Sequence, residues 1–244
     1  MPAHAAPSET DILCEHCGYG LNGLPSTGVC PECGQPIADS TTNDQRDLPP
    51  WESVDDPGWG AFALTTLQIV FTPRRFFRHL RTRPGNAAYD AEFAKRHRII
   101  AAFLFGAALL MHADWMTHGR IFRQPWLYLA IYGLSAAAAT GMLLTLVTWA
   151  AASLTKIEGT YRGYRVPLDV VRRAMNYHAA QLLPVALITF LTVLGFRLGV
   201  EFGYIPYWRE LQYLYVLCGE VVLFAFHLFR TYWIAMRNIM YANR

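Results

Sequence analysis

The sequence predicts an all-α polytopic membrane protein with about four transmembrane helices and a small N-terminal zinc ribbon. Three observations favour this fold class. The chain of 244 residues is 53% hydrophobic and only 16% charged, whereas soluble domains average about a quarter charged. Long apolar runs follow residue 98, while residues 1–58 are polar throughout. Two matched C-x2-C pairs lie within that polar part.

The two cysteine pairs predict a metal site in residues 14–34, CEHCGYGLNGLPSTGVCPECG. Cys14 and Cys17 form the first pair, and Cys30 and Cys33 form the second. Zinc prefers four tetrahedral ligands of this soft kind, and each C-x2-C turn can supply two sulfurs. The segment has few apolar residues, so burial alone cannot hold it folded. We therefore predict one structural zinc ion, whose binding would supply the folding free energy.

Other interpretations of the cysteines stay open, namely iron in a rubredoxin-like knuckle, a redox dithiol and two disulfides. The linker between the pairs is short for the aromatic core of a rubredoxin-like fold. A redox C-x2-C motif normally lies in a thioredoxin-like βαβ unit, which the sequence does not predict. Disulfides require an oxidising compartment, which a cytoplasmic ribbon would not meet. Zinc is the interpretation we favour.

The charge of the N-terminal region argues against a nucleic-acid partner. Residues 1–45 contain no lysine or arginine and six acidic residues. A phosphate backbone would therefore be repelled, because nucleic-acid binding needs a basic surface. We expect the ribbon to contact a protein or to be purely structural.

Two polar segments flank the ribbon, and helices at the membrane surface are expected to follow. Residues 1–13 are predicted to be disordered and residues 35–58 to form a flexible linker, because neither has a core-forming pattern. Residues 59–98 are predicted to form amphipathic interfacial helices, since their apolar run is too short to span a bilayer. Basic residues on one face of the helix that begins at Pro73 predict contact with anionic lipid: Arg74, Arg75, Arg78 and Arg81. A soluble amphipathic helix packed on the ribbon is the alternative.

The transmembrane domain is predicted to occupy residues 99–244. Its four apolar segments are about residues 99–116, 126–154, 179–196 and 212–235. Lysine and arginine are most numerous before the first segment and between the second and third. The positive-inside rule then places both termini in the cytoplasm, which predicts a multi-pass protein of the cytoplasmic (inner) membrane. A fifth span built from residues 59–71 and their neighbours is the alternative.

Several ionisable residues lie within the predicted spans, where a charge is costly and is a functional candidate. Glu220 and His227 are seven residues apart on one face of the fourth segment, and His112 lies near the outer end of the first. A buried contact between Glu220 and His112 is geometrically possible. We favour a structural role for these residues. The alternative is a small transporter or a proton- or metal-handling protein that uses all three.

Two stretches resemble a known family. QIVFTPRRFFRHLRTRPG, residues 68–85, resembles the opening motif of the Yip (Ypt/Rab-interacting protein) domain family. GYRVPLDVVRRAMNYHAAQLLP, residues 163–184, resembles that family's cytoplasmic segment before its later spans. The resemblance covers about residues 59–240, although the family usually has five spans and its pattern does not include the ribbon. Separately, CGYGLNGLP and CPECG resemble a ribbon found at the N-terminus of many bacterial membrane proteins.

The Yip resemblance implies a membrane-organising or protein-interaction component. Eukaryotic members are implicated in vesicle trafficking with small GTPases, whereas bacterial relatives have no settled activity. No catalytic residues transfer to this chain, and the sequence offers no nucleophile and base in a recognisable arrangement. We therefore expect that the protein is not an enzyme.

Overall fold

A computed structural model describes residues 7, 11–41, 46–82, 88–162, 164, 167–206, 210–241 and 243 of the chain. Helices form most of the regular structure in these ranges, which contain isolated β-bridges and no strand. Four helical segments are long and apolar enough to cross a membrane. Four cysteines cluster near the N-terminus. The predicted fold class is therefore confirmed.

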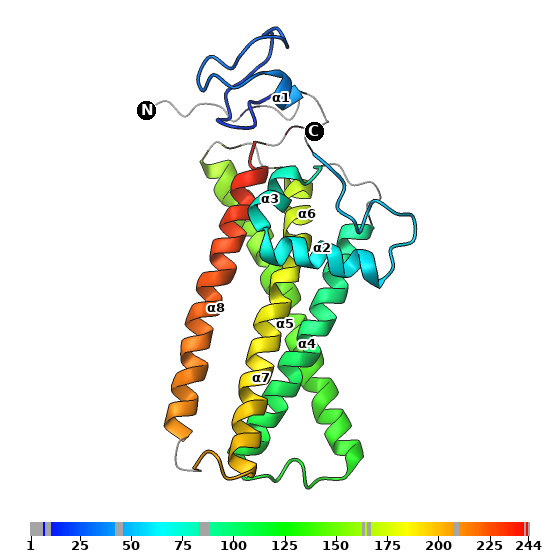
Figure 1. Ribbon diagram of the computed structural model, residues 1–244, viewed down its shortest axis with the longest axis vertical. Coiled ribbons are helices and arrows are strands. Elements are labelled where there is room, and N and C mark those ends of the chain that lie inside the picture. Colours follow the sequence, from blue (N-terminus) through cyan, green and yellow to red (C-terminus); the bar gives the residue numbers. More distant parts are fainter. Residues whose placement is uncertain are drawn as a thin grey trace. The chain divides into compact units, whose positions relative to one another are not determined.

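The helices follow one another along the chain as labelled in Figure 1. They are α1 (Ala38–Thr41), α2 (Trp59–Phe71), α3 (Pro73–His79), α4 (Tyr89–Met116), α5 (Trp126–Tyr161), α6 (Leu168–His178), the 3₁₀ turn η2 (Ala179–Gln181), α7 (Leu182–Glu201) and α8 (Glu210–Ile239).

The helical segments that could span a membrane extend beyond the apolar runs that predicted them. They are Tyr89–Met116, Trp126–Tyr161, Leu168–Glu201 and Leu211–Ile239, with 28, 36, 34 and 29 residues. At a rise of about 1.5 Å per residue, each is longer than the roughly 30 Å hydrocarbon core of a bilayer. Their polar ends can therefore project from the membrane.

The first of these helices begins earlier than the sequence predicted. Residues 89–98 were expected to belong to the interfacial helices, and they instead form the first turns of α4. Asp90 and Glu92 lie in its first turn, where acidic side chains stabilise the positive end of the helix dipole. No glycine or proline interrupts these ten residues, so the helix continues directly into the apolar run.

The third segment contains a local break between α6 and α7. Residues Ala179–Gln181 form a 3₁₀ turn, and Pro184 lies two residues after the start of α7. A proline lacks the N–H that an α-helix needs, and its ring clashes with the carbonyl four residues earlier. That carbonyl belongs to Ala180, so the position of the 3₁₀ turn follows from Pro184.

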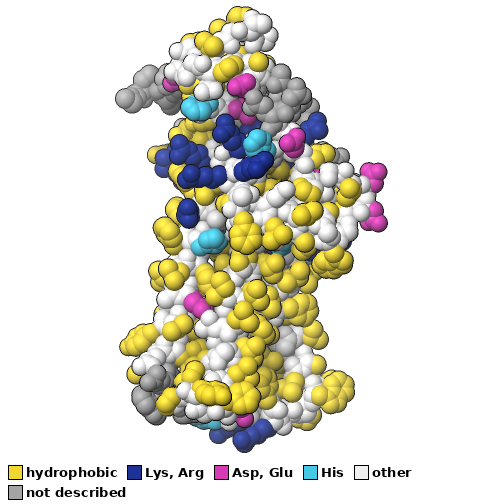
Figure 2. All heavy atoms as spheres, viewed as in Figure 1, with side chains coloured by type: hydrophobic (Ala, Val, Ile, Leu, Met, Phe, Trp, Pro, Cys, Tyr) yellow, Lys and Arg dark blue, Asp and Glu magenta, His cyan; other side chains and the backbone are white. Residues whose placement is uncertain are grey.

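Much of the helical surface is apolar and uncovered by protein. Figure 2 shows hydrophobic side chains over a large part of the visible face. Only 6% of the most apolar stretch of α5 is buried, and the same holds for α8. Apolar surface on this scale requires a bilayer or a partner to cover it. A multi-pass membrane protein accounts for it directly.

The chain divides into two compact units. Unit 1 comprises Met1–Ala94, Thr148–His178 and Thr231–Arg244. Unit 2 comprises Lys95–Val147 and Ala179–Arg230. Unit 1 therefore contains the ribbon, α2, α3 and α6, and unit 2 contains the greater part of the apolar helical surface.

Unit 1 has an aromatic core that includes a residue from the expected linker. Trp51 is only 1% exposed, and its ring lies 5.8 Å from the rings of Phe62 and of Phe93. The indole Nε1 donates a hydrogen bond of 2.7 Å to the carbonyl of Tyr89. Residues 35–58 thus differ from the predicted flexible linker. A buried tryptophan contributes enough apolar contact to anchor a polar segment around it.

The N-terminal segment 1–13 falls mostly outside the described ranges. Residues 1–6 and 8–10 lie outside them, so the prediction of disorder stays a prediction there. Leu13 is within the described part and is 2% exposed. The structured part of unit 1 therefore begins before the first cysteine.

The helix α3 is amphipathic as predicted, but its apolar face contacts protein. Phe76, Phe77 and Leu80 are buried, and the Phe76 ring lies 5.4 Å from that of Tyr177 in α6. All four predicted lipid-binding arginines are exposed, and Figure 2 shows basic side chains gathered over the part of unit 1 that holds α3. The neighbouring helix α2 does expose apolar side chains, namely those of Leu64, Leu67 and Phe71.

Unit 2 is held by close helix packing and a buried ion pair. A Cβ atom on Gly106 of α4 would lie 2.8 Å from the backbone nitrogen of Ala137 in α5, so only glycine permits this approach. Asp114 is fully buried and accepts a 2.9 Å hydrogen bond from Arg197. Its other oxygen accepts one of 2.9 Å from the N–H of Phe122. These bonds connect α4, α7 and the loop before α5.

Candidate metal centre

The ribbon consists of two copies of one local fold, sixteen residues apart in the sequence. In each copy the N–H of the first cysteine donates to a carbonyl five residues later. These bonds are Cys14 to Tyr19 at 2.8 Å and Cys30 to Gln35 at 2.7 Å. An antiparallel bridge flanks each turn, Leu13 with Gly20 and Val29 with Pro36. Each copy therefore presents its two thiols in the same way.

A glycine closes each turn because the backbone there is left-handed. Gly18 has φ 82° and Gly34 has φ 72°, a region that disfavours any side chain. The N–H of Gly18 donates a hydrogen bond of 2.8 Å to the carbonyl of Cys14. The N–H of Gly34 donates one of 2.9 Å to the carbonyl of Cys30. The two copies also repeat an apolar residue, because Leu21 and Ile37 are both buried in the ribbon core. This repeat was not predicted from the sequence.

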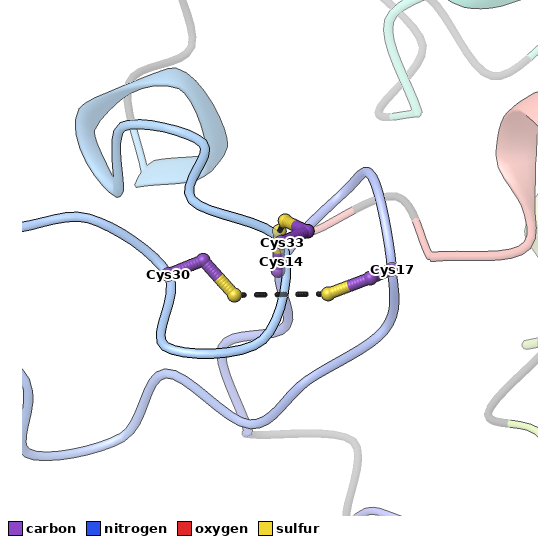
Figure 3. A group of neighbouring side chains, drawn as sticks. All are labelled: Cys14, Cys17, Cys30 and Cys33. Atoms are coloured by element: carbon purple, nitrogen blue, oxygen red, sulfur yellow. Dashed lines mark hydrogen bonds between the residues drawn. The ribbon is translucent and has the colours of Figure 1, made fainter.

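The four sulfurs converge on one point, as Figure 3 shows. The Sγ atoms of Cys14 and Cys33 are 3.6 Å apart, and those of Cys17 and Cys30 are also 3.6 Å apart. All four lie within 4.8 Å of one another. Zn–S bonds of about 2.3 Å in a tetrahedron would place sulfurs about 3.8 Å apart. The arrangement therefore fits a single tetrahedral metal ion.

The same distances oppose the disulfide interpretation. All five cysteines are free, and 3.6 Å is far beyond an S–S bond of about 2.05 Å. Both of these 3.6 Å contacts also run between the pairs, joining the first cysteine of each to the second of the other. A redox C-x2-C dithiol would instead bond within one pair.

The environment of the thiols favours binding of a cation. Burial raises the pKa of the Cys30 thiol, but hydrogen bonds from the backbone of Cys33 and Glu32 outweigh it and lower that pKa to about 7. The pKa of Cys17 is raised, mainly by burial and further by its thiol neighbours. Four thiolates cannot share this space without a positive charge between them. A divalent ion would supply that charge.

The burial of the ligands indicates a structural site. Cys14 and Cys30 are each 1% exposed and pack with Leu21 and Ile37. A metal site closed by four protein ligands has no open position for water or substrate, which catalytic zinc sites keep. The four sulfurs could therefore fix the fold of the ribbon without performing chemistry.

Unit 1 holds the ribbon through side chains from distant parts of the chain. Arg46 bonds Glu15 through its Nε and Nη2 atoms at 3.0 and 2.8 Å, and its Nη1 atom donates to the carbonyl of Leu80. Asn243 donates from its amide to the carbonyls of Leu13 and Ser40, each at 2.7 Å. Arg46 and Asn243 therefore connect the ribbon to Leu80, the residue after α3, and to the segment after α8.

Sequence reasoning did not identify Arg46 or Asn243. Arg46 is the first basic residue of the chain, which is a weak signal that it pairs with the acidic ribbon. Asn243 is 230 positions from Leu13, and no local pattern marks it. Gly18 has a second role that was also missed. A Cβ atom there would lie 2.6 Å from the ring of Tyr241, two residues after the end of α8, so the ribbon and this segment meet closely.

The membrane residues that sequence analysis singled out each have a separate partner in unit 2. Thr192 donates to Glu220 Oε1, His112 Nδ1 lies 3.1 Å from the hydroxyl of Tyr213, and His227 Nε2 lies 3.0 Å from Gln181 Oε1. The other oxygen of Glu220 is buried and has no hydrogen-bond partner among the described residues. A contact between Glu220 and His112, which the sequence made geometrically possible, is not among these bonds.

Comparisons with known proteins give no relative for this fold or this site. No family model matches the chain, and neither a curated protein nor a solved structure matches it.

Proposed function

We propose that this chain is a Yip-like membrane-organising or protein-interaction component that presents its zinc ribbon to a partner protein in the cytoplasm. The observation that carries the proposal is the attachment of the ribbon. Arg46 and Asn243 bond it to the rest of unit 1, so it is held in place beside the ends of the membrane helices. A ribbon held in this way can present a defined surface, whereas a tethered one would have to be ordered on binding.

Zinc is the metal that we assign to the ribbon. Four thiolates at tetrahedral spacing form the commonest structural zinc site, and a closed site of this kind suits an ion without redox chemistry. Iron in a rubredoxin-like site uses the same ligand set and is the alternative. A reducing cytoplasm would keep these thiols available for metal.

The proposed orientation has support from the ends of the chain. Leu13 and Asn243 exchange two hydrogen bonds, which requires both ends to lie on one side of the membrane. An even number of spans satisfies that requirement, and four helical segments are long enough. The exposed arginines of α3 belong to the same unit, so the positive-inside rule favours the cytoplasmic side for all of them.

The residues that we assign to the partner contact are the exposed large apolar side chains of the ribbon, Tyr19, Leu24 and Val29. Their exposed fractions are 41%, 36% and 60%. Exposed apolar side chains on an acidic module that lacks lysine and arginine suit a protein better than nucleic acid.

A crosslinked pull-down from native membranes tests this proposal. We expect a partner to be recovered with the native chain and lost with a Tyr19→Ser, Val29→Ser variant, which keeps all four ligands. Val54→Ser is the matched control, because Val54 is 45% exposed and lies outside the ribbon. Equal recovery of the same partner from a chain that lacks residues 1–34 would contradict the proposal.

A second candidate function is transport of protons or cations, and the unpartnered oxygen of Glu220 favours it. Under the function proposed here, Glu220→Gln is expected to leave stability and partner recovery nearly unchanged, since the amide keeps the bond to Thr192. A transporter would need the ionisable oxygen itself. Flux into liposomes that is present in the native protein and lost in both Glu220→Gln and His112→Ala would establish the second function instead.

A further inference from the structure

A cavity of about 470 Å³ lies within unit 1, between residues 47–50 and the junction of α2 and α3. Its volume is in the range of small-molecule sites. None of its lining residues is a cysteine of the metal centre. The polar side chains that line it are Asp47, Gln68, Thr72, Arg75 and His79, and Phe76 and Leu80 are among the apolar ones.

The lining combines opposite charges that do not neutralise one another. Arg75 and His79 come from successive turns of α3, and Asp47 comes from the segment before α2. Among the described residues, no hydrogen bond or ion pair engages the guanidinium of Arg75 or the carboxylate of Asp47. The two charged groups are therefore available to a ligand that carries both signs.

The backbone fixes Asp47 beside α3. Its N–H donates 2.7 Å to the carbonyl of His79, and its carbonyl accepts a 3.1 Å bond from the N–H of Arg81. The cavity walls are thus joined by main-chain bonds, which substitutions of the lining side chains leave in place.

The cavity begins where the exposed apolar face of α2 ends. Leu64, Leu67 and Phe71 are exposed at helical spacing on α2, and Gln68 and Thr72 beside them already line the cavity. An exposed apolar helix face next to charged groups is typical of a helix at the level of lipid headgroups. This step rests on the membrane placement in the proposed function.

We propose that this cavity binds the headgroup of a phospholipid that carries a phosphodiester and a primary ammonium, as phosphatidylethanolamine does. Arg75 donates to the phosphate, because its guanidinium N–H groups match the phosphate oxygens. Asp47 accepts from the ammonium. A purely anionic headgroup would be repelled by Asp47, and a choline headgroup has no N–H to donate to it.

The test measures lipid binding to the purified, zinc-containing chain in detergent by the shift in unfolding temperature with short-chain lipids. We expect a concentration-dependent rise with phosphatidylethanolamine and a much smaller one with phosphatidylcholine or phosphatidylglycerol. Arg75→Gln should weaken the apparent affinity for phosphatidylethanolamine about tenfold. Arg74→Gln and Arg78→Gln are matched controls, because they remove the same charge from the same helix at positions outside the cavity lining. Both should stay within about twofold of the native chain.

Asp47→Asn should reduce the preference for ethanolamine over choline while phosphate binding remains. Equal losses in the Arg74, Arg75 and Arg78 variants would overturn the proposal in favour of diffuse attraction to the arginines. If free phosphoethanolamine or inorganic phosphate bound as tightly as the lipid, the proposal that the ligand is a phospholipid would be overturned. Zinc content and partner recovery do not depend on this cavity, so its failure would leave the proposed function standing.

Discussion

Replacement of both Cys30 and Cys33 by serine is expected to reduce the bound zinc from about one ion per chain to none. These two residues supply half of the ligand set, and each belongs to a close sulfur pair with the other knuckle. A structural zinc supplies on the order of 10–16 kcal/mol to the folding of such modules. The ribbon core around Leu21 and Ile37 is too small to replace that contribution.

Elemental analysis of the purified protein measures this loss, and Cys218 provides the matched control. Cys218 is an exposed residue of α8 outside the cysteine cluster, so Cys218→Ser should keep the metal. The double variant should still insert in the membrane, because its four helical segments do not contain the ligands. Stoichiometric iron in the native protein, or four free thiols without any metal, would overturn the assignment of zinc.

The same cysteines report the orientation of the ribbon. After removal of the metal with a chelator, a membrane-impermeant maleimide should label the ribbon of a Cys218→Ala chain in inside-out vesicles. Right-side-out vesicles should stay unlabelled, since the positive-inside rule places the ribbon in the cytoplasm. The reverse pattern of labelling would contradict the proposed orientation.

The features that the sequence predicted correctly share a local physical cause. Long apolar runs predict membrane helices because the bilayer offers no water to the backbone N–H and C=O groups. A helix forms all of their hydrogen bonds within the segment itself. The four cysteines predict a cluster because the ligand spacing of a metal knuckle is short-range. Both constraints act on neighbouring residues, so composition and spacing are sufficient to recognise them.

The features that were missed depend on residues far apart in the chain. Residues 35–58 are polar on average, and Trp51 is their one large aromatic residue. The average composition therefore gave no indication that Trp51 is buried and anchors the segment. Asn243 contacts Leu13 across 230 positions, and Glu52 pairs with Arg173 across 121. Charged residues in a polar segment are normally exposed. Only the fold of unit 1 identifies these as buried partners.

The Glu52–Arg173 pair is the basis of the second large effect that we expect. Arg173 donates to both oxygens of Glu52, at 2.6 and 3.0 Å, and to the carbonyl of Arg81 at 2.9 Å. Tyr177 donates to the same carboxylate. The side chain of Glu52 is fully buried and that of Arg173 is 4% exposed. This network therefore joins the segment before α2 to α6 through a carboxylate that has no access to water.

Glu52→Ala is expected to destabilise unit 1 by about 3–5 kcal/mol, because it leaves the guanidinium of Arg173 buried without a counter-charge. Thermal unfolding in detergent and hydrogen exchange of residues 46–58 measure the effect. Glu158→Ala is the matched control. It breaks a 2.6 Å pair with Arg162 whose side chains are about 60% exposed, and such pairs contribute at most about 1 kcal/mol.

A double replacement separates the attraction within the ion pair from the cost of burying an unpaired charge. In Glu52→Leu, Arg173→Met both charges are removed and apolar volume takes their place, so the loss should be smaller than in Glu52→Ala. Exchange at residues 46–58 should then stay slow, since Trp51 keeps its contacts with Phe62 and Phe93. If Glu52→Ala were no more destabilising than Glu158→Ala, the buried pair would contribute no more than a surface one. Trp51 would then anchor this segment through its contacts with α2 and α4.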